Sequence, residues 1–174
     1  VLRPNATERV VEEWSSGTAQ AHFRLQCIDS DGNSLDRRIP RRTKDLAEGD
    51  LVDHISVWGG YGFVPTTGNA FHASVLEKIL PIPEEEYRVC ADIYLVLMSP
   101  LHGPLLAVDE TLGGYRYHDK NNWSNKDSLF NERVMKERLK FRIKKKNIVK
   151  ENYPKPKIRH HKFNAVKIEK VRIS

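Results

Sequence analysis

An alternating pattern followed directly by a tight turn constrains the fold of this chain more than any other feature. Apolar side chains occupy every second position of residues 20–28, which is the period of a half-buried β-strand. The next five residues, Asp-Ser-Asp-Gly-Asn, predict a turn, so residues 35–39 are expected to pair back as a hairpin. On this interpretation His22 faces outward.

Helical and strand-like segments then follow one another. Helical spacing of apolar residues occurs at 4–14, 74–80, 91–99 and 125–149, and strand-like apolar runs occur at 105–108 and 112–117. The polar stretch 40–53 is expected to be a loop, and Pro83 is expected to begin another short element. This order predicts an α/β fold with a mixed sheet and flanking helices, in a chain long enough for one domain with a core.

Charge is distributed unevenly along the chain. Residues 132–174 contain 16 Lys and Arg against 4 acids, whereas residues 1–131 contain 13 against 19. An acidic body argues against nucleic-acid binding by that part. The basic helix carries a thin apolar stripe, which includes Met135 and Ile143. It is expected either to lie on an anionic membrane surface or to dock on the body through the stripe.

Compartment is inferred from three features. The two cysteines, Cys27 and Cys90, are interpreted as reduced core thiols. No apolar run reaches the length of a membrane span, and the first residues lack an initiating Met and a signal-peptide core. We therefore expect a cytoplasmic protein, either free or peripheral on the inner face of the membrane, whose sequence begins inside a longer polypeptide.

Asp92 is the leading candidate for a catalytic residue. It stands at the start of the expected helix 91–99, where free N–H groups and the helix dipole stabilise a carboxylate. A carboxylate within hydrogen-bond reach of a hydroxyl can take its proton. The alternative is an acid that only caps the helix.

His118 and Arg116 follow the last expected strand. His118, with Asn121 close behind it, is interpreted as a ligand of a divalent metal that carries a diphosphate, or as a direct phosphate contact. The alternative is a surface histidine. Arg116 is expected to pair with phosphate or a carboxylate, and the alternative is a salt bridge to Asp109 or Glu110.

Residues 58–71 combine aromatics, glycines and short polar side chains. Trp58 is expected to stack on a sugar ring, and Thr66, Thr67 and Asn69 are expected to hydrogen-bond its hydroxyls. Gly68 is expected to allow the backbone to approach the substrate closely. The alternative is a buried turn whose aromatics fill the core. The sequence has no zinc-ligand spacing, no phosphate-binding glycine loop and no Gly-x-Ser-x-Gly elbow.

The order of these motifs resembles the C-terminal half of a family 2 glycosyltransferase domain, which has the GT-A fold. The resemblance covers residues 1–124, leaves 125–174 as a basic helical extension, and rests on Gly68-Asn69-Ala70-Phe71, Ala91-Asp92-Ile93-Tyr94-Leu95, Gly103-Pro104 and the block 108–118. It implies that Asp92 is the catalytic base of an inverting enzyme. Ala91 stands where a Glu often precedes that base, and Tyr94 where a second Asp often follows.

The resemblance also implies substrates and partners. His118 matches a histidine near the diphosphate and its metal, Mg²⁺ or Mn²⁺, and Asn121 or its neighbour matches a following polar residue. The implied reaction transfers a sugar from a nucleotide-sugar donor to a carbohydrate or lipid-linked acceptor, as in cell-wall or polysaccharide biosynthesis. The family's donor-binding half would precede residue 4, so this chain is expected to be a fragment that binds a nucleotide sugar poorly.

Two other functions stay open at this stage. One is a non-catalytic carbohydrate-binding or scaffold module, in which the acid and the histidine are structural. The other is a nucleic-acid binder that uses the basic tail.

Overall fold

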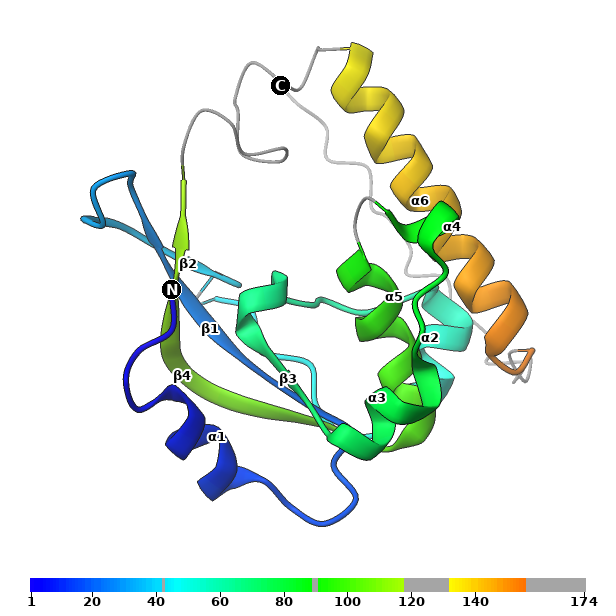
Figure 1. Cartoon of the computed structure of the whole chain (residues 1–174), viewed down its shortest axis with the longest axis horizontal. Coiled ribbons are helices and arrows are strands. Elements are labelled where there is room, and N and C mark those ends of the chain that lie inside the picture. The colour runs from blue at the N-terminus through cyan, green and yellow to red at the C-terminus, as the bar shows by residue number, and fades with distance from the viewer. Residues whose placement is uncertain (42, 89–90, 118–131, 156–174) are drawn as a thin grey trace, which may run out of the picture.

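The computed structural model describes residues 1–41, 43–88, 91–117 and 132–155. Its α/β fold places helices around a mixed four-stranded sheet, as the sequence predicted (Figure 1). The helices are α1 (Ala6–Glu13), α2 (Val52–Trp58), α3 (Ala73–Ile79), α4 (Glu84–Tyr87), α5 (Ala91–Met98) and α6 (Glu132–Asn152). The strands are β1 (Gln20–Ile28), β2 (Ser34–Ile39), β3 (Asn69–Phe71) and β4 (Leu105–Arg116), and the 3-10 turns are η1 (Thr66–Gly68) and η2 (Ser99–His102).

Strand β1 is the centre of the sheet. It pairs antiparallel with β3 through its first residues and with β2 through its last, and it pairs parallel with β4 along its length. The predicted hairpin of β1 and β2 is therefore confirmed. Among the described strands, β3 has a neighbour on one edge only.

Strand β4 is one continuous element where the sequence predicted two strands. Its register with β1 shifts on both sides of Arg24, which pairs with Thr111 although the preceding residue of β1 pairs with Val108. Such a bulge interrupts the ladder without ending the strand. The bulge accounts for the break in the apolar pattern at Asp109 and Glu110.

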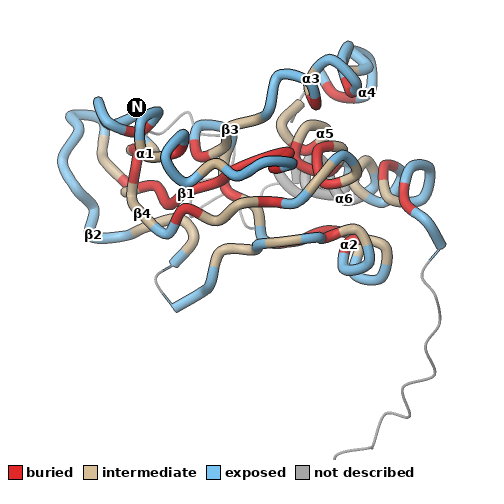
Figure 2. Tube along the Cα trace, turned by 90° about the horizontal axis from the view of Figure 1, so that it is seen from below, coloured by how far each residue is buried: buried red, intermediate tan, exposed pale blue. Residues whose placement is uncertain are grey.

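The prediction that one face of β1 is exposed is wrong. His22 is completely buried and Arg24 retains only 6% of its exposure. Figure 2 shows that most of β1 is buried. The covering residues come from the segment 40–61, which includes the polar stretch 40–53 that the sequence predicts to be a loop. Its Ala47 carbonyl accepts a hydrogen bond from His22 Nε2 at 2.8 Å, and the Tyr61 ring lies 6.3 Å from the imidazole, centroid to centroid.

Helix α2 lies within this covering segment and was not predicted. Its Ile55 is fully buried in the larger apolar core, together with Ile93 and Leu97 of α5 and Ile148 of α6. A second core joins α1 to the opposite side chains of β1, through Val10, Phe23 and Leu25 among others.

Helix α6 docks beside α5 (Figure 1). Tyr153, just beyond its end, donates a hydrogen bond to the Leu97 carbonyl. Residues 125–131 of the predicted helix lie outside the described residues. None of the helices in the described part of the chain is long and apolar enough to cross a membrane.

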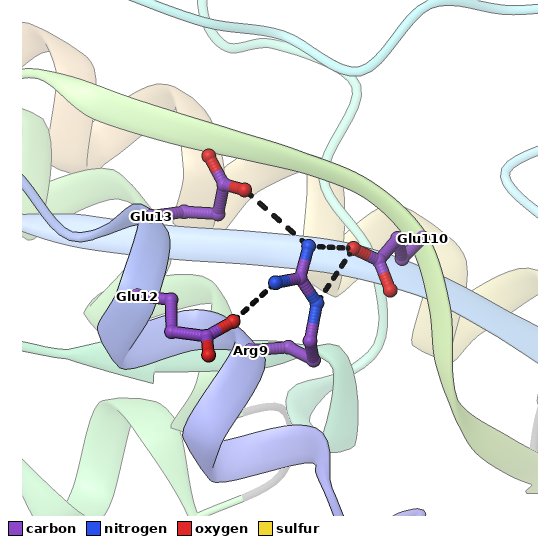
Figure 3. Close-up of polar contacts among 4 residues, drawn as sticks. All are labelled: Arg9, Glu12, Glu13 and Glu110. Atoms are coloured by element: carbon purple, nitrogen blue, oxygen red, sulfur yellow. Dashed lines mark hydrogen bonds and ion pairs between the residues drawn. The ribbon is translucent and has the colours of Figure 1, made fainter.

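Arg9 fastens α1 to β4. Its guanidinium donates to the Glu110 carboxylate, with Nε to Oε1 at 2.9 Å, and also reaches Glu12 and Glu13 of its own helix (Figure 3). The hydrogen bonds from Arg9 hold the pKa of Glu110 below its usual range. This contact fixes how α1 lies against the sheet.

The two cysteines have different outcomes. Cys27 is a buried free thiol, as the sequence predicted. Cys90 lies outside the described residues.

Candidate functional site

Asp92 lies in the first turn of α5 and is partly buried. Its Oδ2 accepts a hydrogen bond from Thr66 Oγ1 at 3.1 Å, so η1 and the start of α5 meet at this carboxylate. A carboxylate accepts protons and hydrogen bonds, and a fixed neighbour restricts its rotamer. The pair therefore presents an oriented acceptor of protons.

Asn69 holds the turn that carries Thr66. Its Nδ2 donates to the carbonyls of Val64 at 3.2 Å and Pro65 at 2.9 Å, and its Oδ1 accepts from Gln20 Nε2 at 2.9 Å. The amide that was expected to contact sugar hydroxyls is therefore engaged inside the protein. Its contribution is to position η1.

Gly68 lets this turn lie directly against β1. A Cβ atom at this position would stand 2.8 Å from Val64 Cγ2 and 3.0 Å from the Phe23 carbonyl oxygen. Real Cβ contacts are essentially never as short as 2.8 Å, and a contact of 3.0 Å is tighter than nine in ten, so a side chain here would require η1 or Val64 to shift. The predicted glycine thus has a packing function close to Asp92.

An apolar groove of about 580 Å³ lies beside η1. Phe23 of β1 and Thr67 of η1 are among its lining residues. Its other lining residues come from the N-terminal segment with α1 and from β3 with the residues after it: Leu2, Ala6, Thr7, Val10, Val11, Trp14, Asn69, Ala70, Phe71, His72 and Ala73. All three residues of β3 line the groove, and β3 pairs with one neighbour only among the described strands.

Trp58 and Arg116 lie in two other parts of the structure, at the end of α2 and beside the β1–β2 turn. Trp58 ends α2 with 72% of its surface exposed. Arg116 Nη1 donates to the carbonyls of Asp29, at 3.3 Å, and Ser30, so it braces the hairpin turn. Neither residue hydrogen-bonds the Thr66–Asp92 pair in the described part of the chain.

The aromatics after Trp58 belong to the core. Tyr61 is buried, its hydroxyl donates to the Val96 carbonyl at 3.0 Å, and burial raises its pKa. Phe63 packs edge-on against Tyr61 with ring centroids 6.0 Å apart. These two rings therefore fill the core, which was the alternative to sugar stacking for this segment.

His118 and Asn121 lie outside the described residues. Within the described residues, no group of three or more His, Cys, Asp or Glu side chains could hold a metal ion. The donor set for a divalent metal is thus not assembled by this part of the chain, and we derive no step through a metal.

The hydroxyl partner of Asp92 was missed by sequence reasoning. Thr66 was grouped with the aromatic-glycine segment, and nothing local joins it to an acid 26 positions later. The buried Arg24 was missed for a similar reason, because the residues that cover it follow β2.

One curated protein shares detectable sequence similarity. The chain is 29% identical over 140 residues to a protein of Nostoc sp. named as an uncharacterized glycosyltransferase, and the match covers 78% of this chain. It covers 42% of the relative, so the chain spans about two fifths of that protein's length. No protein-family model matches the chain. No solved structure matches it either.

Proposed function

We propose that this chain is the acceptor side of a family 2 glycosyltransferase with a GT-A-like fold, with residues 1–124 in the catalytic domain and 125–174 as an extension. The observation that carries the proposal is the Asp92 carboxylate, oriented by Thr66 at the start of α5. The name of the Nostoc relative supports the same general activity.

In this proposal the reaction is a single displacement with inversion. Asp92 accepts the proton of an acceptor hydroxyl while the oxygen forms a bond to the anomeric carbon of the donor sugar. The bond from that carbon to the diphosphate oxygen breaks, and the nucleoside diphosphate leaves with the electron pair. Thr66 keeps the carboxylate in place through its hydrogen bond.

The donor-binding half belongs, in this proposal, to polypeptide outside this chain. More than half of the Nostoc relative lies outside the match, which leaves room for such a half. The apolar groove and the free edge of β3 give it a surface to cover, since an unpaired strand edge accepts another strand. His118, Asn121 and a divalent metal are assigned to the diphosphate side.

A transfer assay tests the proposed function. The chain joined to its donor-binding half is incubated with nucleotide sugars and a panel of carbohydrate and lipid-linked acceptors, with release of nucleoside diphosphate as the readout. Release that requires both donor and acceptor is expected. A joined protein that binds carbohydrate but never releases diphosphate would support the non-catalytic module.

A titration tests the fragment assignment by itself. Calorimetry of the isolated chain with UDP-sugars and Mn²⁺ is expected to show weak binding or none. Tight binding by this chain alone would show that the donor site lies within it.

Residues 132–174 are assigned to the surface of an anionic membrane, on the cytoplasmic side. The support is a basic helix whose Lys146 and Lys150 are exposed and whose Ile143 retains 50% exposure. Salt-sensitive retention of RNA or DNA, lost on removal of this segment, would instead support the nucleic-acid binder.

A further inference from the structure

A second, polar cavity of about 420 Å³ opens on β1, β2 and β4. It is lined by Arg24, Arg38, Thr43, Asp109 and Thr111 and shares no lining residue with the apolar groove. Two arginines and two threonines therefore line one space together with a single acidic residue. The proposed glycosyl transfer does not use this cavity.

The charge of Arg24 is unusually buried, since arginine side chains are seldom covered unless they are paired. Its Nε donates to Asp109, and its Nη1 donates to three carbonyls of the segment 40–44, the shortest at 3.1 Å to Lys44. Arg24 Nη2 has no protein partner among the described residues. Among those residues, the only polar side-chain atom that is both fully buried and without a partner is His22 Nδ1, so Nη2 retains some exposed surface. Arg24 thus retains one donor nitrogen without a protein partner among the described residues, and its side chain lines the cavity.

The segment 37–44, from which Arg38 and Thr43 line the cavity, is rich in basic residues. Five of the 13 Lys and Arg residues in 1–131 stand between positions 37 and 44, although that part of the chain has more acids than bases. Asp109 balances Arg24, whereas Arg38 forms no ion pair in the described part of the chain. The cavity therefore has an excess of positive charge.

The bulge in β4 sets the geometry of the cavity. Because the register shifts at this point, Thr111 stands opposite Arg24 in the ladder, and Asp109 two residues earlier reaches the same guanidinium. Bulges commonly redirect side chains next to binding sites. Hydroxyl and guanidinium donors then converge from neighbouring strands.

We propose that this cavity binds a phosphate group. Arg24 Nη2, the Arg38 guanidinium and the hydroxyls of Thr43 and Thr111 form its donor set. Arginine suits phosphate because its planar fork matches two oxygens and its charge strengthens each hydrogen bond. The phosphate belongs either to inorganic phosphate or to a phosphorylated sugar, and the inference does not depend on glycosyl transfer.

Nitrogen-15 NMR of the whole chain tests the proposal, with inorganic phosphate as the first probe. Saturable shifts of the backbone amides of Arg38, Thr43 and Thr111 are expected. Glucose 6-phosphate, with glucose as its control, forms the second arm. Tighter binding of the phosphorylated sugar than of phosphate assigns the site to a sugar phosphate, and equal binding assigns it to free phosphate.

Two variants locate the binding. Arg38→Gln is expected to weaken phosphate binding about tenfold, since it removes a charge-assisted contact. Arg3→Gln makes the same change of charge on an exposed residue outside the cavity and is expected to leave the affinity unchanged. Thr111→Val removes one hydroxyl at nearly constant shape and is expected to weaken binding less than Arg38→Gln.

Three results would overturn the proposal. They are an absence of shifts at these amides, shifts confined to the lysines of α6, and equal affinities for Arg38→Gln and Arg3→Gln. Spectra of the unliganded variants show directly whether each remains folded, so a loss of binding is not confused with unfolding.

Discussion

Thr66 and Asp92 are 26 positions apart and share one hydrogen bond, and this pair is the centre of the proposed site. The residues around it act by placing it. Asn69 holds the turn through three contacts, and Gly68 leaves the space in which that turn meets β1. Proton transfer is assigned to the Asp92 carboxylate, and the proposed contribution of Thr66, Gly68 and Asn69 is to position it.

Thr66→Val tests whether the hydroxyl positions the carboxylate. The substitution removes one hydrogen bond to a charged group at nearly constant shape, so turnover is expected to fall about tenfold with little change in KM. Ser16→Ala is the control, because it also removes one hydroxyl, at an exposed position between α1 and β1. Equal turnover in the two variants would remove the positioning role of Thr66.

His22 predicts how stability depends on pH. Burial lowers its pKa below the ordinary value of 6.5 and outweighs the opposing effect of the hydrogen bond with the Ala47 carbonyl, while the charge of Arg24 adds a smaller lowering. The unfolded chain then binds a proton at a higher pH than the folded chain does. The free energy of unfolding is therefore expected to fall as pH drops below about 6.5.

His22→Gln isolates that contribution. Urea unfolding at pH 7.5 and 5.5 is expected to show a smaller loss of stability on acidification for this variant than for the unaltered chain. His54→Gln, at an exposed position of α2, is expected to leave the loss unchanged. If His22→Gln and the unaltered chain lose equal stability, His22 does not control this response.

At the scale of elements, sequence patterns predicted secondary structure formed by neighbouring residues, but they did not predict burial by segments distant in the sequence. The β1–β2 hairpin and α1, α3 and α5 were predicted from the spacing of a few neighbouring residues. The burial of His22 and Arg24 was not, because their cover is the distant segment 40–61. A polar residue on a strand is exposed only if nothing folds over it, and the strand itself does not contain that information.

Helix α6 shows the same division between local pattern and distant contact. Its basic character was evident from composition, but its docking depends on Ile148, which is buried against the core of α5. Lys145 lies over the Phe63 ring, and burial lowers its pKa. Some of its lysines thus pack against the protein while others face outward.

The membrane assignment of α6 rests on the outward lysines. Lys146→Gln with Lys150→Gln is expected to reduce sedimentation with vesicles of anionic lipid, because each basic residue near such a surface contributes about 1 kcal/mol. The control exchanges Arg3 and Lys78 for Gln, which alters the same number of charges elsewhere. Equal sedimentation of both double variants would argue against a membrane role for α6.

At the scale of the whole molecule, the sheet has a completed side and an open side. The Val1–Arg3 segment and Gly49 hydrogen-bond the backbone of β4 along its outer edge. On the other side, β3 has no second neighbour among the described strands and adjoins an apolar groove. Because one side of the sheet is open, we propose that the donor-binding half lies at β3. The Nostoc relative is more than twice as long as the matched region, which leaves room for such a half.

Part of the candidate site could be predicted from the sequence. Asp92 is indicated by its place at the start of a helix, and Gly68-Asn69-Ala70-Phe71 by its place in the order of motifs. The structure places Thr66, two residues before that motif, in hydrogen-bond contact with Asp92. Trp58 and Arg116 were added because their side-chain types suit sugars and phosphates, and the structure gives Arg116 a backbone-bracing contact. Residue type suggests a chemistry, but only the fold decides which side chains share a space.

The most direct test of the central claim is the turnover of Asp92→Asn in the chain joined to its donor-binding half. Asn keeps the shape and the hydrogen bond from Thr66 but does not accept the acceptor's proton, so kcat is expected to fall at least about a hundredfold while KM changes little. Asp53→Asn, an exposed acid in the first turn of α2, is the control and should retain full turnover. Turnover of Asp92→Asn equal to that of Asp53→Asn would contradict the assignment of Asp92 as the base.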